Sequence, residues 1–133
     1  IIEDYGEALR NKDADRCVSH YADDVVQFDL APPLENRGKE TARKHLGEWF
    51  KTFSGPIELE MTGLKISAGD DSAFAYVMNH ISGTSTRGDK NDHWVRVTIG
   101  FRKTDGKWLV DHEHVSVPFY MDGSFRAALD LKP

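Results

Sequence analysis

The sequence predicts an α+β fold in which three helices cover one face of a curved, mainly antiparallel sheet. Apolar residues recur at helical spacing only in the first part of the chain, up to residue 53. Residues 57–119 instead alternate with a period of two, as strands do. The length of 133 residues suits one domain, which we expect to span residues 1–133.

Helical periodicity occurs in two stretches. Residues 3–24 form the first, and it is broken before Asp13, which we expect to be the N-cap of the second of two short helices. Residues 39–53 form the second stretch, and they place apolar side chains, including Trp49, on one helical face. A Gly-Pro pair then ends this third helix.

The strands are short at first and then follow one another closely. Residues 25–30 are β-branched and aromatic, and two prolines end this strand. Four further strands follow: 57–67, 72–84, 92–103 and 107–119. Asp105-Gly106 is a strong hairpin signal between the last two. A sheet curled around helices leaves an apolar pocket at its mouth, which is the usual kind of small-molecule site.

Charge and cysteine content exclude several classes of function. Lys and Arg number 17 against 22 Asp and Glu, which gives a formal net charge of −5. Because nucleic acids and anionic membranes select basic surfaces, we expect neither as a partner. No window approaches the roughly 18 apolar residues of a membrane span. Cys17 is the only cysteine, which excludes an internal disulfide, and we expect a cytoplasmic protein.

Asp29 is the first candidate for chemistry. It follows an apolar strand and precedes a loop that begins with prolines. At the edge of an apolar cavity, burial would raise the pKa of such a carboxyl, and the group could act as a base near neutral pH. The alternative is an aspartate that caps the turn.

Two further candidates lie on the central strands. His80 shares a strand face with Tyr76 and Met78, and this face looks buried. His80 is then either a hydrogen-bonded core histidine or an acid/base in the pocket, where Tyr76 and Met78 contact the ligand. Arg96 shares a face with Trp94 and either faces solvent or, beside Trp94 in the pocket, orients an anionic or enolate-forming substrate.

The run His112-Glu113-His114 is the densest polar cluster on a strand. Imidazoles suit zinc, iron or copper, but catalytic zinc usually needs three protein ligands, and nothing in the sequence fixes the third. We therefore predict no metal. We also expect no cofactor, because the chain lacks a Gly-rich phosphate loop, a Walker-type lysine and a nucleophile elbow.

Several segments carry a resemblance to a known superfamily. Residues 5–13 and 20–25 resemble the N-terminal helices of ketosteroid isomerases, and residues 36–40 resemble the start of their third helix. Residues 105–116 are similar to the last hairpin of many SnoaL-like proteins and to the association domain of calcium/calmodulin-dependent protein kinases. The chain is thus identified as a member of the SnoaL-like, nuclear transport factor 2-like superfamily. This resemblance implies a cone-shaped fold and a homodimer packed through the sheet.

The same resemblance implies roles for two residues. Asp29 falls where the isomerases keep the carboxylate that moves the proton, and Tyr5 falls where they keep an oxyanion-hole tyrosine. The second acid of that hole is absent, because the matching position is near Thr98 or Ile99.

The register of the last strand leaves two alternatives open. Alignment with the isomerases turns Glu113 toward the pocket, whereas the apolar positions Trp108 and Val110 turn His114 toward it as a ligand contact. A shift of one residue moves every side chain to the other face, and a bulge before Asp111 can produce either arrangement.

Two functions fit these observations. The first is a cofactor-free isomerase, dehydratase or cyclase that binds a small apolar carbonyl compound, with Asp29 as the base and His80 or Tyr5 as hydrogen-bond donors to the oxygen. The second is a non-catalytic ligand-binding or oligomerisation domain. A perturbed, buried Asp29 would favour the first, and a solvated, turn-capping Asp29 would favour the second.

Overall fold

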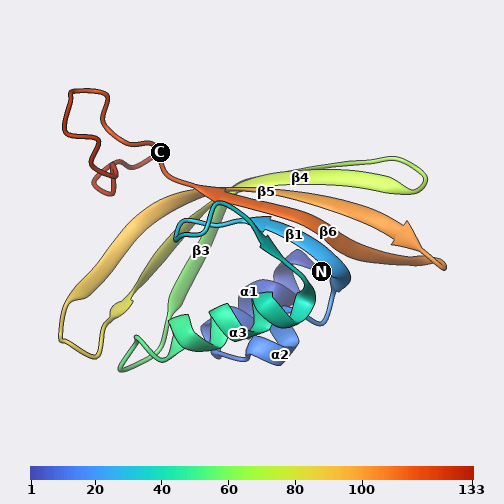
Figure 1. Ribbon diagram of the computed structural model, residues 1–133, viewed down its shortest axis with the longest axis horizontal. Coiled ribbons are helices and arrows are strands. Elements are labelled where there is room, and N and C mark those ends of the chain that lie inside the picture. The colour runs from blue at the N-terminus through green and yellow to red at the C-terminus, as the bar shows by residue number, and fades with distance from the viewer.

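In the computed structural model, which describes residues 1–133, the helices lie beneath a strongly curved sheet (Figure 1). The helices are α1 (Ile2–Arg10), α2 (Ala14–Cys17) and α3 (Lys39–Phe50). The strands are β1 (Tyr21–Phe28), β2 (Asn36–Arg37), β3 (Glu58–Ala68), β4 (Ser72–Thr84), β5 (Lys90–Thr104) and β6 (Lys107–Ser116). The predicted α+β class is therefore confirmed. The short strand β2 was not predicted.

The six strands form one sheet in the order β2-β1-β6-β5-β4-β3. Strands β3 to β6 make the predicted antiparallel meander, and β1 joins β6 in parallel. Asp105 and Gly106 have φ angles of 51° and 77°, the positive values that a two-residue type I′ hairpin turn requires. The hairpin predicted from the Asp-Gly pair is thus confirmed.

Three predicted boundaries near the candidate site were wrong. The first strand begins at Tyr21 rather than residue 25, because the backbone of β6 extends the pairing: Val110 N–H donates to the His20 carbonyl at 2.7 Å. This strand ends at Phe28, so Asp29 lies just beyond it. The third helix ends at Phe50 rather than residue 53.

The core fills the concave side of the sheet. Side chains of α1 and α3, such as Leu9 and Phe50, pack against Val77, Val95 and Val97 of the central strands. A second buried cluster lies toward the other end of α1 and includes residues of β1, β4, β5 and β6. These clusters fix α1 across the concave face and leave space between the sheet and α3.

A bulge in β6 decides which side chains face the helices. Gly100 pairs with His112 and the next residue, Phe101, pairs with Val110, so Asp111 is the extra residue. The bulge puts Val110 and Glu113 on the same, concave face, although they are three residues apart. Before the bulge, the register that turns Val110 toward the pocket is therefore correct. After the bulge, the register that turns Glu113 toward the pocket is correct.

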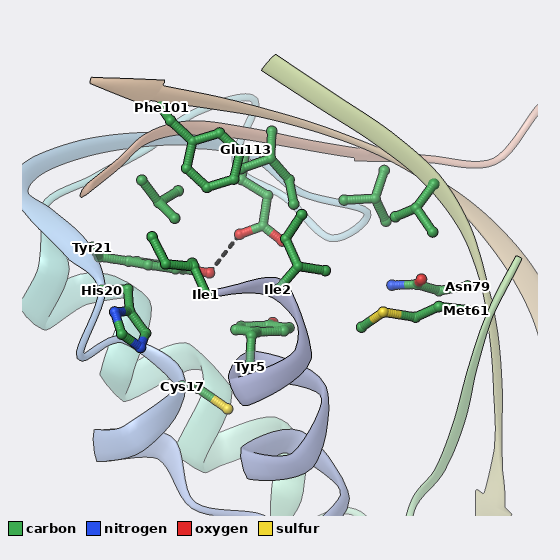
Figure 2. A pocket seen from close by; sticks show the side chains of 14 residues that line it. Ile1, Ile2, Tyr5, Cys17, His20, Tyr21, Met61, Asn79, Phe101 and Glu113 are labelled. Atoms are coloured by element: carbon green, nitrogen blue, oxygen red, sulfur yellow. Dashed lines mark hydrogen bonds between the residues drawn. The ribbon is translucent and has the colours of Figure 1, made fainter. Parts of the chain in front are cut away.

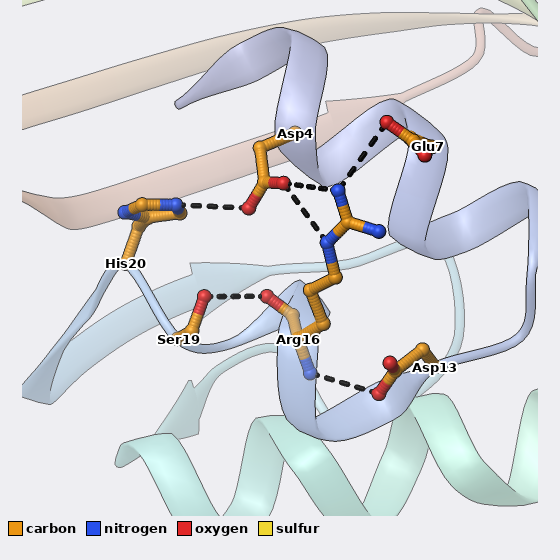
Figure 3. A network of polar contacts seen from close by, with 6 residues as sticks. All are labelled: Asp4, Glu7, Asp13, Arg16, Ser19 and His20. Atoms are coloured by element: carbon orange, nitrogen blue, oxygen red, sulfur yellow. Dashed lines mark hydrogen bonds and ion pairs between the residues drawn. The ribbon is translucent and has the colours of Figure 1, made fainter.

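A polar network on the helices fixes the position of α1 (Figure 3). Arg16 of α2 contacts Asp4 at 2.5 Å and Glu7 at 3.3 Å, and the His20 ring contacts Asp4 at 3.0 Å. The hydrogen bonds from Arg16 and then His20 lower the pKa of Asp4. Asp13 accepts the Arg16 backbone N–H at 3.0 Å, which confirms its predicted role as N-cap. These contacts hold α1, and hence Tyr5, against the concave face of the sheet.

Candidate functional site

The main cavity has a volume of about 520 Å³ and lies between the concave face of the sheet, α3 and the loop after β1. Such a volume is typical of small-molecule sites. Its rim is formed by exposed residues that include Asp29 and Thr52, and its inner end by the buried Glu113 and Asn79. Much of the wall between them is apolar: Leu9, Ala42, Leu46, Trp49, Ile81, Val95, Val97 and Val115.

A second cavity of about 30 Å³ lies behind this inner end (Figure 2). It is far too small for an organic ligand, since a single water occupies a similar volume in the liquid. Four residues line both cavities: Tyr5, Asn79, Val97 and Glu113. The polar atoms of the site therefore gather where the two cavities meet.

Glu113 is the central polar group of the site. Its side chain is buried, and its Oε2 accepts hydrogen bonds from the Tyr21 hydroxyl at 2.5 Å and from Gln27 Nε2 at 3.1 Å. Burial raises the pKa of Glu113, and these two hydrogen bonds oppose the rise only in part. Both hydrogen bonds end on Oε2, so this oxygen already serves as an acceptor. When Glu113 is protonated, the proton is therefore expected on Oε1.

Two tyrosines accompany this carboxyl. The rings of Tyr5 and Tyr21 stack at a centroid distance of 6.4 Å. Burial, and next the nearby Glu113 carboxyl, raises the pKa of both hydroxyls well above the usual value. Each tyrosine therefore keeps its proton at neutral pH and remains a hydrogen-bond donor.

The remaining polar lining has mixed character. Asn79 is 8% exposed, and its side-chain Oδ1 is buried without a hydrogen-bond partner. His93 also lines the main cavity, and burial lowers its pKa, which favours the neutral imidazole. Burial raises the pKa of the Cys17 thiol to about 12, so this cysteine is not a nucleophile at neutral pH.

Three of the predicted site residues lie in this cavity: Tyr5, Asp29 and Trp49. Trp49 projects from α3 and packs edge-on against Phe53 at 5.1 Å. Asp29 is exposed at the rim, and its Oδ1 accepts the Leu30 backbone N–H at 2.7 Å. This carboxylate therefore caps the turn and lines the cavity at once.

The prediction that the face of Tyr76, Met78 and His80 is buried was wrong. Tyr76 is 46% and Met78 is 37% exposed, whereas the alternate residues of β4 are buried against the helices. His80 stacks on Trp94 at 4.7 Å and binds Asp92 at 2.5 Å on the outer, convex face.

The two remaining predicted ligand contacts also lie on the convex face. Arg96 pairs with Met78 across the strands and bonds to Ser116 at 3.2 Å. His114 is exposed beside Phe28, at a centroid distance of 5.4 Å. In total, six predicted site residues do not reach the cavity: Tyr76, Met78, His80, Trp94, Arg96 and His114.

Strand alternation could have located some of the residues that sequence reasoning missed. Once Val77 is known to face inward, the period of two places Asn79 beside it in the cavity. The same alternation places His93 beside the inward Val95 and Gln27 beside the buried Val25, and both line the cavity. His, Cys, Asp and Glu side chains form no group of three or more that could hold a metal ion.

The fold and site define a class of protein: a curved sheet around helices that encloses an apolar cavity with a buried carboxyl. The chain belongs to the SnoaL-like domain family, whose pattern it matches over residues 1–120, which confirms the resemblance seen in the sequence. No curated protein matches it. No helix is both long enough and apolar enough to cross a membrane.

Solved structures support the same assignment. A nuclear transport factor 2-like protein of unknown function from Pseudomonas putida KT2440 is 33% identical, with a TM-score of 0.89, over 99% of this chain and 91% of that chain. A candidate scytalone dehydratase from Novosphingobium aromaticivorans is 17% identical, with a TM-score of 0.78, over 96% and 85% of the two chains. A candidate calcium/calmodulin-dependent protein kinase II association domain from Xanthomonas campestris is 22% identical, with a TM-score of 0.73, over 86% and 81%. The last two similarities concern the fold alone.

Proposed function

We propose that this protein is a cofactor-free isomerase, dehydratase or cyclase that moves a proton next to a carbonyl group of a small, largely apolar molecule. One observation carries the proposal: a single cavity holds a buried carboxyl with a raised pKa, Glu113, and an exposed carboxylate at its rim, Asp29. Two carboxyls in such different environments can divide the roles of acid and base.

In the proposed reaction, the Asp29 carboxylate takes a proton from the carbon next to the carbonyl. The C–H electron pair then forms the enolate, and negative charge develops on the carbonyl oxygen. Protonated Glu113 donates a hydrogen bond from Oε1 to that oxygen, and the Tyr5 hydroxyl is a second donor. Asp29 returns the proton to another carbon in an isomerisation; in a dehydration the enolate re-forms the carbonyl and expels a β-hydroxyl, which takes the proton from Asp29 and leaves as water.

Glu113 takes the place of the acid that is absent near Thr98 and Ile99. It lies opposite Ile99 on the neighbouring strand, so the acid comes from β6 rather than β5. Burial favours its protonated form, which is the form that can donate to an oxyanion.

The experiment is hydrogen–deuterium exchange at the α-carbon of 1-indanone, an apolar bicyclic ketone, followed by proton NMR in D₂O. We expect the protein to accelerate exchange above buffer, and Asp29→Asn to lower the rate constant at least about 100-fold, the usual contribution of a general base. Asn keeps the side-chain oxygen that accepts the Leu30 N–H. Glu48→Gln, another exposed carboxylate at the rim, is the matched control and should keep the exchange rate.

Exchange by the wild type at the buffer rate would overturn the proposal, as would full activity of Asp29→Asn. The hydrogen bond from Leu30 to Asp29 and the exposure of that carboxylate are the features expected of the second candidate function, a non-catalytic ligand-binding or oligomerisation domain, so the proposal of catalysis depends on the buried Glu113 in the same cavity. The second function predicts binding of apolar ketones without any exchange.

We also propose a homodimer that packs through the convex face of the sheet. Phe74, Tyr76 and Met78 form a contiguous exposed row along β4, and no helix covers this side. An exposed apolar row of this kind is typical of an interaction surface. The resemblance to the superfamily implies the same arrangement.

A further inference from the structure

Asn79 interrupts an otherwise apolar row on the concave face. Along β4 the inward residues are Ala75, Val77, Asn79 and Ile81, and all four are buried. The side-chain Oδ1 of Asn79 has no hydrogen-bond partner in the protein. Burying an acceptor without a donor costs folding free energy, so the fold alone gives no reason for an amide here.

The position of this acceptor suggests its purpose. Asn79 is one of the four residues that line both cavities, together with Tyr5, Val97 and Glu113. Figure 2 shows its side chain projecting from the sheet toward the cavity, level with Met61 and across from Glu113. A ligand that fills the main cavity to its inner end therefore lies against the Asn79 side chain, beside the acid.

The other two polar groups there can donate: the Tyr5 hydroxyl, and Glu113 in the protonated form that the proposed reaction uses. Tyr5 keeps its proton, and the raised pKa of Glu113 favours its protonated form. The inner end therefore combines groups that donate to an oxygen with one group that accepts from a hydroxyl or N–H. Because the wall around them is apolar, a ligand that leaves one of these groups without a hydrogen bond loses binding free energy. Such a cavity favours ligands whose polar groups pair with these side chains.

We propose that Asn79 Oδ1 accepts a hydrogen bond from the ligand, so that the protein selects apolar ring compounds carrying a hydroxyl or N–H donor in addition to a carbonyl oxygen. This inference rests on the proposed function for the identity of the binding cavity, and it does not depend on catalysis. Asn79 is a specificity-determining residue in this account.

The test compares two fluorescent probes, 2-naphthol and 2-methoxynaphthalene, in equilibrium binding to the intact chain. Both have the same ring system and an oxygen at the same position, but only naphthol can donate. We expect the wild type to bind naphthol about tenfold more tightly, the usual worth of one hydrogen bond in a buried site. Asn79→Leu should remove this preference by weakening naphthol binding, while Glu48→Gln, an exposed residue at the rim, should keep it.

Thermal unfolding of Asn79→Leu gives an independent readout. Because Leu removes a buried, unpaired acceptor, we expect an unchanged or higher Tm. If Leu prevents folding, Asn79→Ala removes the same acceptor without adding bulk and takes its place in the binding test. A marked fall in Tm for both variants would indicate a structural role and overturn the inference.

Three binding results would also overturn it: equal affinity of the wild type for both probes, no measurable binding of either, or a preference for naphthol that Asn79→Leu keeps. The last result would assign the acceptor to another group. Loss of α-proton exchange with an intact preference for naphthol would reject the proposed catalysis alone. Exchange without that preference would reject this inference alone.

Discussion

The concave and convex faces of the central strands differ in burial far more than in apolar character. Ala75 and Val77 on the concave face are 0% and 4% exposed. Phe74 and Tyr76, their neighbours on the convex face, are 52% and 46% exposed although their side chains are larger. Helices cover the first face, and no helix covers the second (Figure 1).

This difference teaches that cover, rather than size or hydrophobicity, decides which face becomes the core. Small side chains suit the concave face because α1 packs closely there, with Ala8 and Leu9 against the strands. The larger side chains on the convex face lie outside that contact. They are available for a second copy of the chain, whereas the concave face holds the candidate site.

The largest expected effect comes from placing a charge on each face. Val77→Lys buries an unpaired ammonium on the concave side, and we expect it to lower the free energy of unfolding by more than about 3 kcal/mol. Thr62→Lys lies on the exposed face of β3, and its effect should stay within about 0.5 kcal/mol. Urea denaturation followed by circular dichroism measures both.

If Val77→Lys fails to fold, Val77→Ala keeps the comparison measurable, with an expected loss of roughly 1–3 kcal/mol from the deleted methyl groups. Equal losses for substitutions on the two faces would contradict the comparison.

The fold could be predicted from the sequence because its signals are local. Helical and strand periodicity identified α3 and the four long strands, and Asp105-Gly106 fixed the last hairpin. The faces of β4 and β5 were harder, because both carry apolar side chains. One signal pointed to the correct faces. The larger apolar residues of β4 lie opposite polar residues of β5, which is typical of an exposed face. The pairs are Met78 with Arg96 and Tyr76 with Thr98.

The candidate site was only partly predictable. Tyr5, Asp29 and Trp49 were identified: Asp29 by its place after an apolar strand and then by resemblance, Tyr5 by resemblance, and Trp49 by helical periodicity. Glu113 depended on the bulge at Asp111, and no residue type in that segment marks a bulge in advance. Asn79 was missed because it belongs to the row of smaller side chains, which looked like the solvent face.

The next effect concerns the convex face alone. We expect the wild type to sediment as a dimer in analytical ultracentrifugation, and Tyr76→Lys to weaken self-association at least about tenfold, because it places charges against each other in an apolar contact. Thr86→Lys, in the exposed turn between β4 and β5, adds the same single charge away from the row and should leave the dimer intact. A wild type that is monomeric at every concentration would rule out this interface.

The smallest expected effect is a pH dependence that arises on the concave face, at Glu113. Burial raises the pKa of this carboxyl in the folded state above its usual value of 4.5. Between the unfolded and folded pKa values the folded protein binds more protons, so the free energy of unfolding falls as the pH rises from about 4.5. Glu113→Gln removes this contribution.

The advantage of Glu113→Gln over the wild type should therefore grow with pH and then level off once the pH passes the folded pKa. Tyr21→Phe should change stability in the opposite sense, because the Tyr21 hydroxyl lowers the pKa of Glu113 by donating to its ionised form. Without that donor the folded pKa rises further, and the fall in stability extends to higher pH. Urea titrations from pH 4 to 8 measure the free energy of unfolding of both variants. The contradicting result is a difference between Glu113→Gln and the wild type that stays constant with pH. It would mean that Glu113 ionises as freely in the cavity as in the unfolded chain. Such a carboxyl would no longer be the protonated donor that the proposed reaction requires.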